Sequence, residues 1–559
     1  MIEPHNDTNA FSGSRRVEVI DHEYAAITEG RTRIIIGVLV FGLVLFLLMA
    51  RLAEVSVLRG PKARAAFAVN SVTPRADIVD RNGEILVTTL ETYSLYAEPS
   101  KVWDPAQTTD ALLAALPDLD PAVVEARLSS NKSFIFIKRN LTPRERQAVF
   151  TLGMPGLGFR VEPRRIYPRG RLAAHALGWT DVDMAGAAGS ERAFDAELSA
   201  PGAAPKKLSL DMRIQFALDD ELRKGMERFA AKAVSGVVLD IHTGEILAMA
   251  SMPDFDPNRF GTAMPQTRLN RATMATYELG STFKPLTMAL ALEHGVDPEV
   301  KLPVQKPVTI RRKTINDDHK SNVPMGMFDI LAQSSNRGAA LYALDVGEAG
   351  QRDFLRKLGL FDRAPIELAE TAAPQLPREW QDLTTATISY GHGIAVTPLA
   401  LASALSSLVN GGHYVDPTLQ YVSLGQERPR RRVISPDTAA TMTDMMRYVV
   451  TDGTGRNAAV RGYGVMGKTG TAEKPGIDGY QKKKLVSSFV AAFPYSEPKY
   501  LVFIAYDEPQ PASGTHGYAT AGWNAAPTAG AVVSRMVTIL GMKRESATQI
   551  ARSAQSGGH

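Results

Sequence analysis

The chain has 559 residues, 44% of them hydrophobic and 22% charged, which is enough for two or three folded domains and excludes a disordered polymer. The net charge is +4 and the pI about 8.9, a mild excess that does not indicate a nucleic-acid partner. Cysteine is absent, which excludes disulfides, thiol nucleophiles and cysteine-ligated metals and leaves the redox compartment open.

An uncharged apolar run over 34–50 lies between Arg33 and Arg51, near the lower length limit for a membrane-spanning helix. The preceding tail carries six acidic residues, unlike the short basic start of a secretory signal, and no small-residue cleavage site follows directly. We therefore expect one uncleaved anchor over 34–52 rather than a signal peptide or a buried core helix. Its two flanks carry four Lys or Arg each, so the positive-inside rule does not orient it.

After the anchor, the apolar patterns predict an α/β fold. Two runs around Asn82-Gly83 predict a tight hairpin over 78–87, because both turn residues tolerate positive φ. Segment 199–205 has the composition of a linker. Further on, the patterns predict a helix over 212–229, strand pairs within 235–251 and between 485–493 and 500–507, and a helix over 528–540. Because strands open and close this stretch, we expect one mixed sheet whose first and last strands meet.

Ser281 and Lys284 are the first candidate catalytic pair. On a helix, residues three apart share a face, and Pro285 removes the N–H that would bond the Ser281 carbonyl, so a helix should begin near Ser281. A serine hydroxyl becomes a nucleophile when a base takes its proton, and a partly desolvated lysine is neutral enough to do so. Alone, this four-residue motif is a weak signal.

Two further motifs supply functions that the first one lacks. Ser334-Ser335-Asn336 follows an apolar stretch that predicts a helix end; its first serine could relay a proton and its asparagine could hold a substrate amide. Lys468-Thr469-Gly470-Thr471 comes shortly before the late strand pair. A strand with Lys and Thr side chains offers a cation and hydroxyls to a carboxylate, and Gly470 would allow a ligand close to the backbone.

The three motifs occur in the order that is typical of penicillin-binding proteins and β-lactamases. The chain resembles the class B penicillin-binding proteins, most closely the division-type (FtsI-like) peptidoglycan D,D-transpeptidases, from the anchor to about Met542. Segments that match this family lie at 74–86, 164–181, 189–198, 236–258, 270–285, 331–336, 389–399, 452–458 and 467–474. The segment at 389–399 favours the division type over the elongation type. Ala76 and Leu279 stand where the family usually has Gly and Pro, and neither change removes a catalytic group.

The resemblance implies a mechanism. Ser281 would attack the penultimate D-alanine carbonyl of a D-Ala-D-Ala stem peptide, with Lys284 as the base, and Ser334 would help return the proton to the leaving D-alanine. Backbone N–H groups of Ser281 and Thr471 would form the oxyanion hole, and an amine of a second stem peptide would resolve the acyl-enzyme. The implied substrate-binding residues are Asn336, Lys468, Thr469, Gly470 and Thr471. No cofactor or metal is implied, and β-lactams would acylate the same serine.

The resemblance also implies a domain order. A non-catalytic α+β pedestal over 53–210 would precede a transpeptidase domain over 211–542, a mixed sheet between helices, with a disordered tail over 543–559. Because the substrate lies outside the inner membrane, residues 1–33 should be cytoplasmic and the catalytic domain periplasmic. The implied partners are an FtsW-type glycosyltransferase and other divisome proteins, with no nucleic acid.

The sequence also contains weaker matches to motifs of other protein classes. Residues 462–469 match the P-loop pattern and 453–458 a dinucleotide pattern, but neither lies between a strand and a helix as those sites require. The ten histidines include no zinc motif. An elongation-type transpeptidase and a non-enzymatic divisome scaffold are the alternatives. A β-lactamase needs no pedestal, a penicillin sensor usually has more spans, and a bifunctional synthase needs a glycosyltransferase signature that the pedestal lacks.

Overall fold

The computed structural model describes residues 35–51, 75–318, 320–476 and 479–545. The chain divides into two units, Met1–Thr73 and Pro74–His559. Within the first unit, residues 35–51 are helical. Among the residues described, no helix has both the length and the apolar character needed to cross a membrane. The anchor expected over 34–52 stays a prediction, and the tail expected over 1–33 lies outside the described residues.

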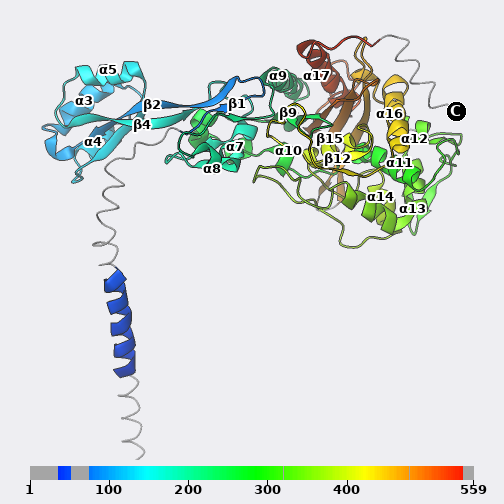
Figure 1. The fold of residues 1–559 in the computed structure, drawn as a ribbon, viewed down its shortest axis with the longest axis horizontal. Coiled ribbons are helices and arrows are strands. Elements are labelled where there is room, and N and C mark those ends of the chain that lie inside the picture. The colour runs from blue at the N-terminus through cyan, green and yellow to red at the C-terminus, as the bar shows by residue number, and fades with distance from the viewer. Residues whose placement is uncertain (1–34, 52–74, 319, 477–478, 546–559) are drawn as a thin grey trace, which may run out of the picture. The chain divides into compact units, whose positions relative to one another are not determined.

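The first part of the second unit contains a five-stranded sheet centred on β2 (Ile85–Ala97) (Figure 1). β2 pairs antiparallel with β1 (Ile78–Val79), β3 (Ile135–Leu141) and β4 (Leu157–Ile166). β7 (Lys206–Lys207) pairs with β1 in parallel. The sheet therefore joins the start of this unit to the residues that directly precede the next domain.

Three helices pack at one end of this sheet: α3 (Pro105–Ala115), α4 (Pro121–Leu128) and α5 (Pro143–Thr151) (Figure 1). Each begins with proline, and the side chain before it, Asp104, Asp120 or Thr142, accepts backbone N–H bonds of the first turn. Proline at that position loses no helical hydrogen bond, so cap and proline together fix where each helix starts. Shorter elements complete this part: η2 (Pro99–Lys101), α6 (Ala174–Leu177), β5 (Trp179–Thr180), β6 (Gly186–Ala188), α7 (Gly189–Ala193) and α8 (Asp195–Leu198).

The hairpin expected over 78–87 is present, but its turn is not the two-residue type that Asn82-Gly83 predicts. Five residues separate β1 from β2, and Gly83 has positive φ, 91°, whereas Asn82 does not. The carboxylate of Asp80 accepts the N–H groups of Asn82 and Glu84 at 2.7 and 2.9 Å. An aspartate side chain that closes on its own backbone therefore replaces the expected turn.

A buried ion-pair network joins distant segments of this part. The side chain of Glu191 has no solvent exposure and accepts hydrogen bonds from the Nε atoms of Arg75 and Arg165, both at 2.7 Å. Arg75 also donates to Asp195 at 2.7 Å and to the carbonyl oxygen of Glu191 at 2.6 Å. Because a buried carboxylate is stable only when its charge is matched, this network ties α7 to β4 and to the chain before β1.

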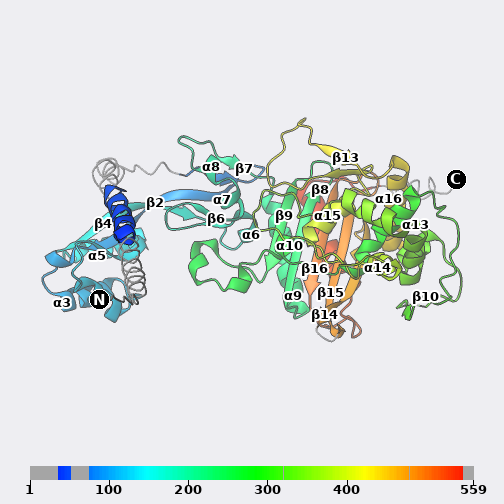
Figure 2. The ribbon, with the colours of Figure 1, turned by 90° about the horizontal axis from the view of Figure 1, so that it is seen from below.

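The second part of the unit is built on a five-stranded antiparallel sheet in the order β14–β15–β16–β8–β9 (Figure 2). The strands are β8 (Ala233–Asp240), β9 (Ile246–Met252), β14 (Met466–Gly476), β15 (Gly479–Phe493) and β16 (Tyr500–Asp507). The two strand pairs predicted from the sequence are confirmed, and β8 pairs with β16, so the first and last strands meet as expected. β14 lies at the edge of the sheet.

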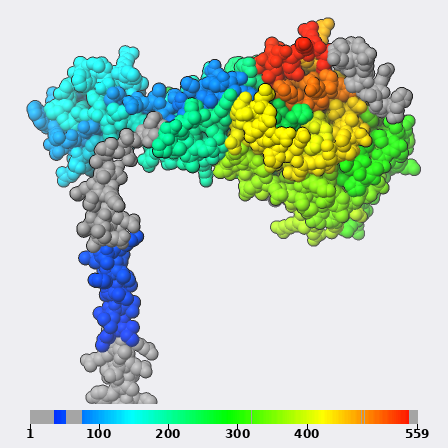
Figure 3. Space-filling model, viewed as in Figure 1, coloured from blue at the N-terminus to red at the C-terminus, as the bar shows by residue number. Residues whose placement is uncertain are grey.

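Both faces of this sheet are covered by helices. α9 (Met212–Arg228) and α17 (Ala525–Ile539) pack on one face with Val238, while Val237 lies in the opposite core with α15 (Pro398–Ser406). Alternate strand residues thus enter two different cores, as the two-residue period of a fully buried strand requires. In the space-filling view, the red C-terminal residues lie against earlier, green residues of the same domain (Figure 3).

The remaining elements of this domain are η3 (Pro257–Thr262), η4 (Pro265–Thr267), α10 (Arg271–Met274), η5 (Gly280–Phe283), α11 (Lys284–Glu293), β10 (Val308–Ile310), β11 (Lys313–Ile315), α12 (Met327–Ala332), α13 (Asn336–Lys357), α14 (Asp382–Ile388), β12 (His413–Val415), β13 (Arg430–Arg432), α16 (Pro436–Thr451) and η6 (Arg456–Ala458). The tail expected over 543–559 lies outside the described residues beyond residue 545.

The two parts share one hydrophobic core. Ile78 and Leu86 belong to the same buried cluster as Ile246 of β9. At the junction, the N–H of Arg81 donates to the carbonyl of Leu210 at 2.9 Å. The domain boundary expected at residue 210 is therefore crossed by continuous packing.

We predict that Glu191→Gln lowers the free energy of unfolding by about 3 kcal/mol, because it leaves two buried guanidinium groups without a charged partner. Urea unfolding followed by circular dichroism measures the change. Glu197→Gln is the control, since Glu197 is 61% exposed in its pair with Lys206 and should cost less than about 1 kcal/mol. Equal stability of the Glu191 variant and the parent would contradict the inference that this ion-pair network stabilises the fold.

Candidate active site

Ser281 and Lys284 lie one turn apart, as the sequence predicts. Ser281 is in the 3-10 turn η5, and the α-helix α11 begins at Lys284, whose N–H donates to the carbonyl of Ser281. The side chain of Lys284 has no solvent exposure, while Ser281 is partly exposed. The expected helix start at Ser281 is thus a tight turn that leads into α11.

Two glycines bring the turn η5 against the edge strand β14. A Cβ on Gly280, which has φ of 57°, would lie 2.6 Å from the carbonyl oxygen of Thr471. A Cβ on Gly470 would lie 2.4 Å from the carbonyl oxygen of Leu279. The missing side chain of Gly470 therefore leaves room for the backbone of the turn that carries Ser281, and the expectation that it also admits a ligand stays a prediction. The close approach places Ser281 beside the strand that carries Lys468.

The three motifs meet at Ser334. This residue lies between α12 and α13 with φ of 62°, a conformation that is strained for a residue other than glycine. Lys284 Nζ donates to the carbonyl oxygen of Ser334 and, at 3.1 Å, to its Oγ. Lys468 Nζ donates to the same Oγ at 2.9 Å. One hydroxyl therefore connects the two lysines.

Burial changes the protonation of both lysines. It lowers the pKa of Lys284 to about 7, because the charged ammonium loses its hydration, while the carboxylates of Asp317 and Asp318 oppose this shift. Burial, and then the charge of Lys284, lower the pKa of Lys468 well below its usual value. A substantial fraction of Lys284 is therefore a neutral amine near neutral pH and can accept a proton.

Asp317 fixes the start of α13 and was not identified from the sequence. Its buried carboxylate accepts hydrogen bonds from Ser335 Oγ at 2.8 Å and from the N–H groups of Asn336 and Arg337 at 2.5 and 3.0 Å. A carboxylate at a helix N-terminus is stabilised by the helix dipole and by the free N–H groups. Asp317 thus holds the strained turn at Ser334, and no sequence motif indicated this role because Asp317 lies 19 residues before Asn336.

The substrate-binding residues predicted from the sequence line the same region. Asn336 Nδ2 donates to the carbonyl of Asn316 at 2.9 Å. The hydroxyl of Thr469 lies 2.7 Å from that of Thr454, which sequence reasoning missed although it lies in the matching segment 452–458. Thr471 Oγ1 accepts the N–H of Ala521 at 3.1 Å. The link between these two motifs is the contact of Lys468 with Ser334, two residues before Asn336.

A second loop borders the turn that carries Ser281. The N–H of Gly280 donates to the carbonyl of Gly391 at 3.3 Å, and the ring of the next residue, His392, lies 5.4 Å from that of Tyr480 on β15. Tyr480 donates to Glu278 at 2.8 Å. These contacts connect the tip of the β14–β15 hairpin to the residues just before Ser281.

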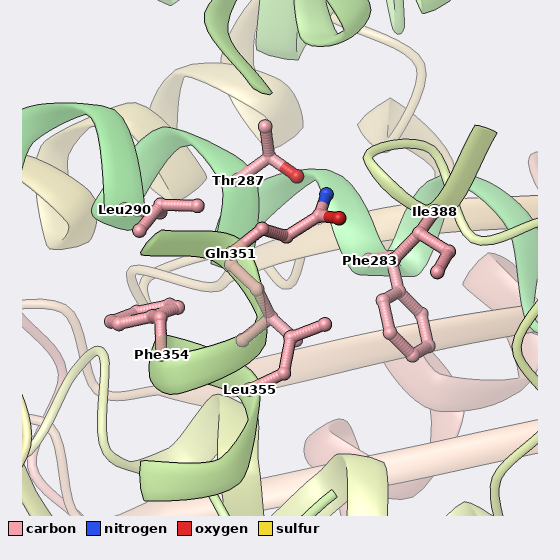
Figure 4. Close-up of a pocket in the computed structure, with 8 residues that line it drawn as sticks. Phe283, Thr287, Leu290, Gln351, Phe354, Leu355 and Ile388 are labelled. Atoms are coloured by element: carbon pink, nitrogen blue, oxygen red, sulfur yellow. The ribbon is translucent and has the colours of Figure 1, made fainter. Parts of the chain in front are cut away.

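A mainly apolar cavity lies behind α11, between α11, α13 and α14 (Figure 4). The one long polar side chain in this view, Gln351, donates to the carbonyl of Thr385 at 2.9 Å and accepts from Trp380 at 3.1 Å. Its polar atoms are thus satisfied within the packing. The helix that begins at Lys284 therefore rests on a hydrophobic layer away from the site.

Two family models match the chain. They describe the penicillin-binding protein transpeptidase domain, over residues 234–532, and the penicillin-binding protein dimerisation domain, over residues 70–201. A probable peptidoglycan D,D-transpeptidase FtsI of Caulobacter vibrioides is 42% identical over 84% of this chain and 82% of that protein. The chain belongs to the penicillin-binding protein transpeptidase family. Its two matched domains give it the class B architecture, so the resemblance and fold class inferred from the sequence are confirmed.

More distant members of the family share the same architecture. The peptidoglycan D,D-transpeptidase FtsI of Escherichia coli is 29% identical over 85% of both chains. The crystal structure of penicillin-binding protein 3 of Mycobacterium tuberculosis, complexed with aztreonam, aligns with a TM-score of 0.67 at 25% identity, over 84% of this chain and 97% of that chain.

We predict that the rate of Ser281 acylation by a β-lactam falls about tenfold per pH unit below a midpoint near 7, because protonated Lys284 has no lone pair to accept a proton. Asp317→Asn should move this midpoint to lower pH, since the Asp317 carboxylate raises the pKa of Lys284. Stopped-flow acylation rates at a series of pH values give the midpoint.

Asp353→Asn serves as the control for this profile. Asp353 is 58% exposed and pairs with Lys357 at the far end of α13, so its removal should leave the midpoint unchanged. A midpoint above pH 9 in the parent, or one that Asp317→Asn does not move, would contradict the role of Lys284 as a neutral base.

Proposed function

We propose that this penicillin-binding protein is a peptidoglycan D,D-transpeptidase that cross-links stem peptides through an acyl-enzyme on Ser281. The observation that carries the proposal is the meeting of Lys284 and Lys468 on the hydroxyl of Ser334, beside the partly exposed Ser281. The curated relatives are named as enzymes of this type. An acyl-transfer site needs a nucleophile, a base and a proton relay, and these residues provide them.

In the proposed acylation step, neutral Lys284 takes the Ser281 proton while Oγ attacks the penultimate D-alanine carbonyl. The C–N bond to the terminal D-alanine breaks, and a proton returns to its amine through Ser334. In the second step, an amine of another stem peptide attacks the ester carbonyl, the C–O bond to Ser281 breaks as the new C–N bond forms, and the proton lost by the amine returns to Ser281 Oγ. The hydroxyl of Ser334 suits this relay because it contacts both lysines.

The oxyanion hole is proposed at the edge of β14. The Thr471 carbonyl faces Gly280, so the N–H of Thr471 lies along the same strand edge, as the geometry of an extended strand requires. No neighbouring strand pairs with this edge among the described residues. The N–H groups of Ser281 and Thr471 are then available to stabilise the negative oxygen of the tetrahedral intermediate.

The terminal carboxylate of the donor peptide is proposed to bind beside Lys468, Thr469 and Thr471. A bound carboxylate would favour the charged form of Lys468, whose pKa burial lowers in the free protein. Asn336 is proposed to hold the peptide backbone, which would require its amide to exchange the bond to Asn316 for one to the substrate. Gly470 keeps the strand close to the nucleophile turn.

We further propose a role in division at the inner membrane. The segment 34–52 would be a single-pass anchor, with residues 1–33 cytoplasmic and the catalytic domain periplasmic, where the substrate lies. An FtsW-type glycosyltransferase and other divisome proteins would be the partners. The FtsI relatives support this role over an elongation-type role.

Fluorescent penicillin tests the catalytic proposal. We expect stable, stoichiometric covalent labelling of the full chain, because the acyl-enzyme of a transpeptidase awaits an amine acceptor that the assay does not supply. Ser281→Ala should lose the label completely, and Ser321→Ala, a change at another serine of the same domain, should keep it. Gel fluorescence and intact-protein mass measure both.

Two other outcomes would argue against transpeptidation. A parent protein that takes up no label would indicate a non-enzymatic scaffold. A label that is released within seconds would instead indicate a β-lactamase.

A further inference from the structure

A short basic hairpin lies beside the active site. β10 and β11 pair antiparallel, with Ile310 opposite Lys313, so Arg311 and Arg312 form a two-residue turn. The hydroxyls of Thr309 and Thr314 lie 3.0 Å apart across the strands. Figure 2 shows β10 at the periphery of the domain.

The base of this hairpin is fixed to the catalytic elements. Ile315 is buried with Ala340 of α13 and Ala386 of α14, and Val308 and Ile310 pack against them. The next residues along the chain are Asn316 and Asp317, which contact the start of α13 as described above. The hairpin therefore has a fixed position on the Asn336 side of the site.

The hairpin and its flanks carry an unneutralised positive charge. Six cationic residues lie between 301 and 320: Lys301, Lys306, Arg311, Arg312, Lys313 and Lys320. All six are exposed, and within the described part of the chain none forms an ion pair or a side-chain hydrogen bond. Cations elsewhere are often paired: Lys474 and Arg535 each contact two carboxylates. Of the two acidic residues between 301 and 320, Asp317 is buried against α13, so Asp318 is the one exposed carboxylate beside six cations.

The turn of the hairpin carries an arginine in an unusual backbone conformation. Arg311 has φ of 54° at the first position of a two-residue turn, where glycine is favoured because it adopts positive φ without steric cost. The turn thus places an arginine where conformational preference alone favours glycine. The positive charge therefore stands at the turn in a backbone conformation that costs free energy for a residue with a Cβ.

We propose that the basic hairpin, residues 306–313, is a docking surface for the carboxylates of peptidoglycan stem peptides on a polymeric strand. This inference rests on the proposed transpeptidase function and extends it from one peptide to the polymer. Stem peptides end in carboxylates, so a strand that bears many of them is a polyanion and complements this surface. Lipid is a poorer match, because no large apolar side chain is exposed among the described residues from 301 to 320.

The consequence for catalysis is a higher local concentration of stem peptides. Coulomb attraction between exposed charges acts over roughly 8 Å at physiological ionic strength, so the hairpin holds a strand only near itself. Several weak contacts with one polymer together give a higher overall affinity, because binding is multivalent. A strand held there keeps its other stem peptides close to Asn336 and the active site.

Co-sedimentation of the full chain, in detergent, with purified insoluble peptidoglycan tests the proposal. We expect Arg311→Gln/Arg312→Gln/Lys313→Gln to bind about tenfold more weakly than the parent, with a smaller dependence on salt. The matched control is Lys132→Gln/Arg144→Gln/Arg160→Gln, which removes three exposed, unpaired cations from the dimerisation domain and should bind within twofold of the parent. Thermal unfolding checks that both variants are folded.

Three further probes identify the ligand. Amidation of the stem-peptide carboxylates, or removal of the stem peptides, should lower parent binding to the level of the hairpin variant. Phosphatidylglycerol vesicles should bind parent and hairpin variant equally. The proposal is overturned if the parent does not bind peptidoglycan, if the hairpin variant binds like the parent, if binding survives amidation, or if the variant loses vesicle binding instead. Penicillin labelling at Ser281 is scored separately, so failure of the catalytic proposal is distinguishable from failure of this one.

Discussion

The site depends on one costly arrangement: two lysine side chains, Lys284 and Lys468, are buried against a single serine hydroxyl. Water cannot screen their charges there, so the neutral amine becomes accessible near neutral pH. The same burial lowers the pKa of Lys284 to about 7, as the proposed role of a base requires. The strand, turn and helix elements around the site keep these two lysine side chains and the Ser334 hydroxyl in place.

Three elements hold it from different sides. The edge strand β14 carries Lys468, the turn η5 that contains Ser281 packs against that strand at Gly280 and Gly470, and the connection between α12 and α13 carries the strained Ser334. Asp317 secures the last of these while its charge limits how far the Lys284 pKa falls. Two effects therefore oppose each other in the pKa of Lys284: desolvation lowers it, and the nearby carboxylate of Asp317 raises it.

Periodicity and motif spacing predicted the long elements well, because a buried strand or an amphipathic helix leaves its period in the sequence. The strand pairs of the sheet and the turn from Ser281 to Lys284 are examples. Contacts between distant segments left no such trace. The carboxylate of Asp80 closes the turn that was expected to depend on Asn82-Gly83. A Cβ on Gly470 would meet the backbone of Leu279. Asp317, two residues after β11, binds the start of α13, a helix distant in the sequence.

The central claim is that Lys284 is a neutral base in the resting protein, and its own titration tests this most directly. Lysines labelled with ¹³C at Cε can be followed by NMR as pH is varied, and the Lys284→Arg variant identifies the Lys284 signal by its loss. The account predicts a midpoint near 7 for that signal. A midpoint for Lys284 at the ordinary lysine value would contradict it.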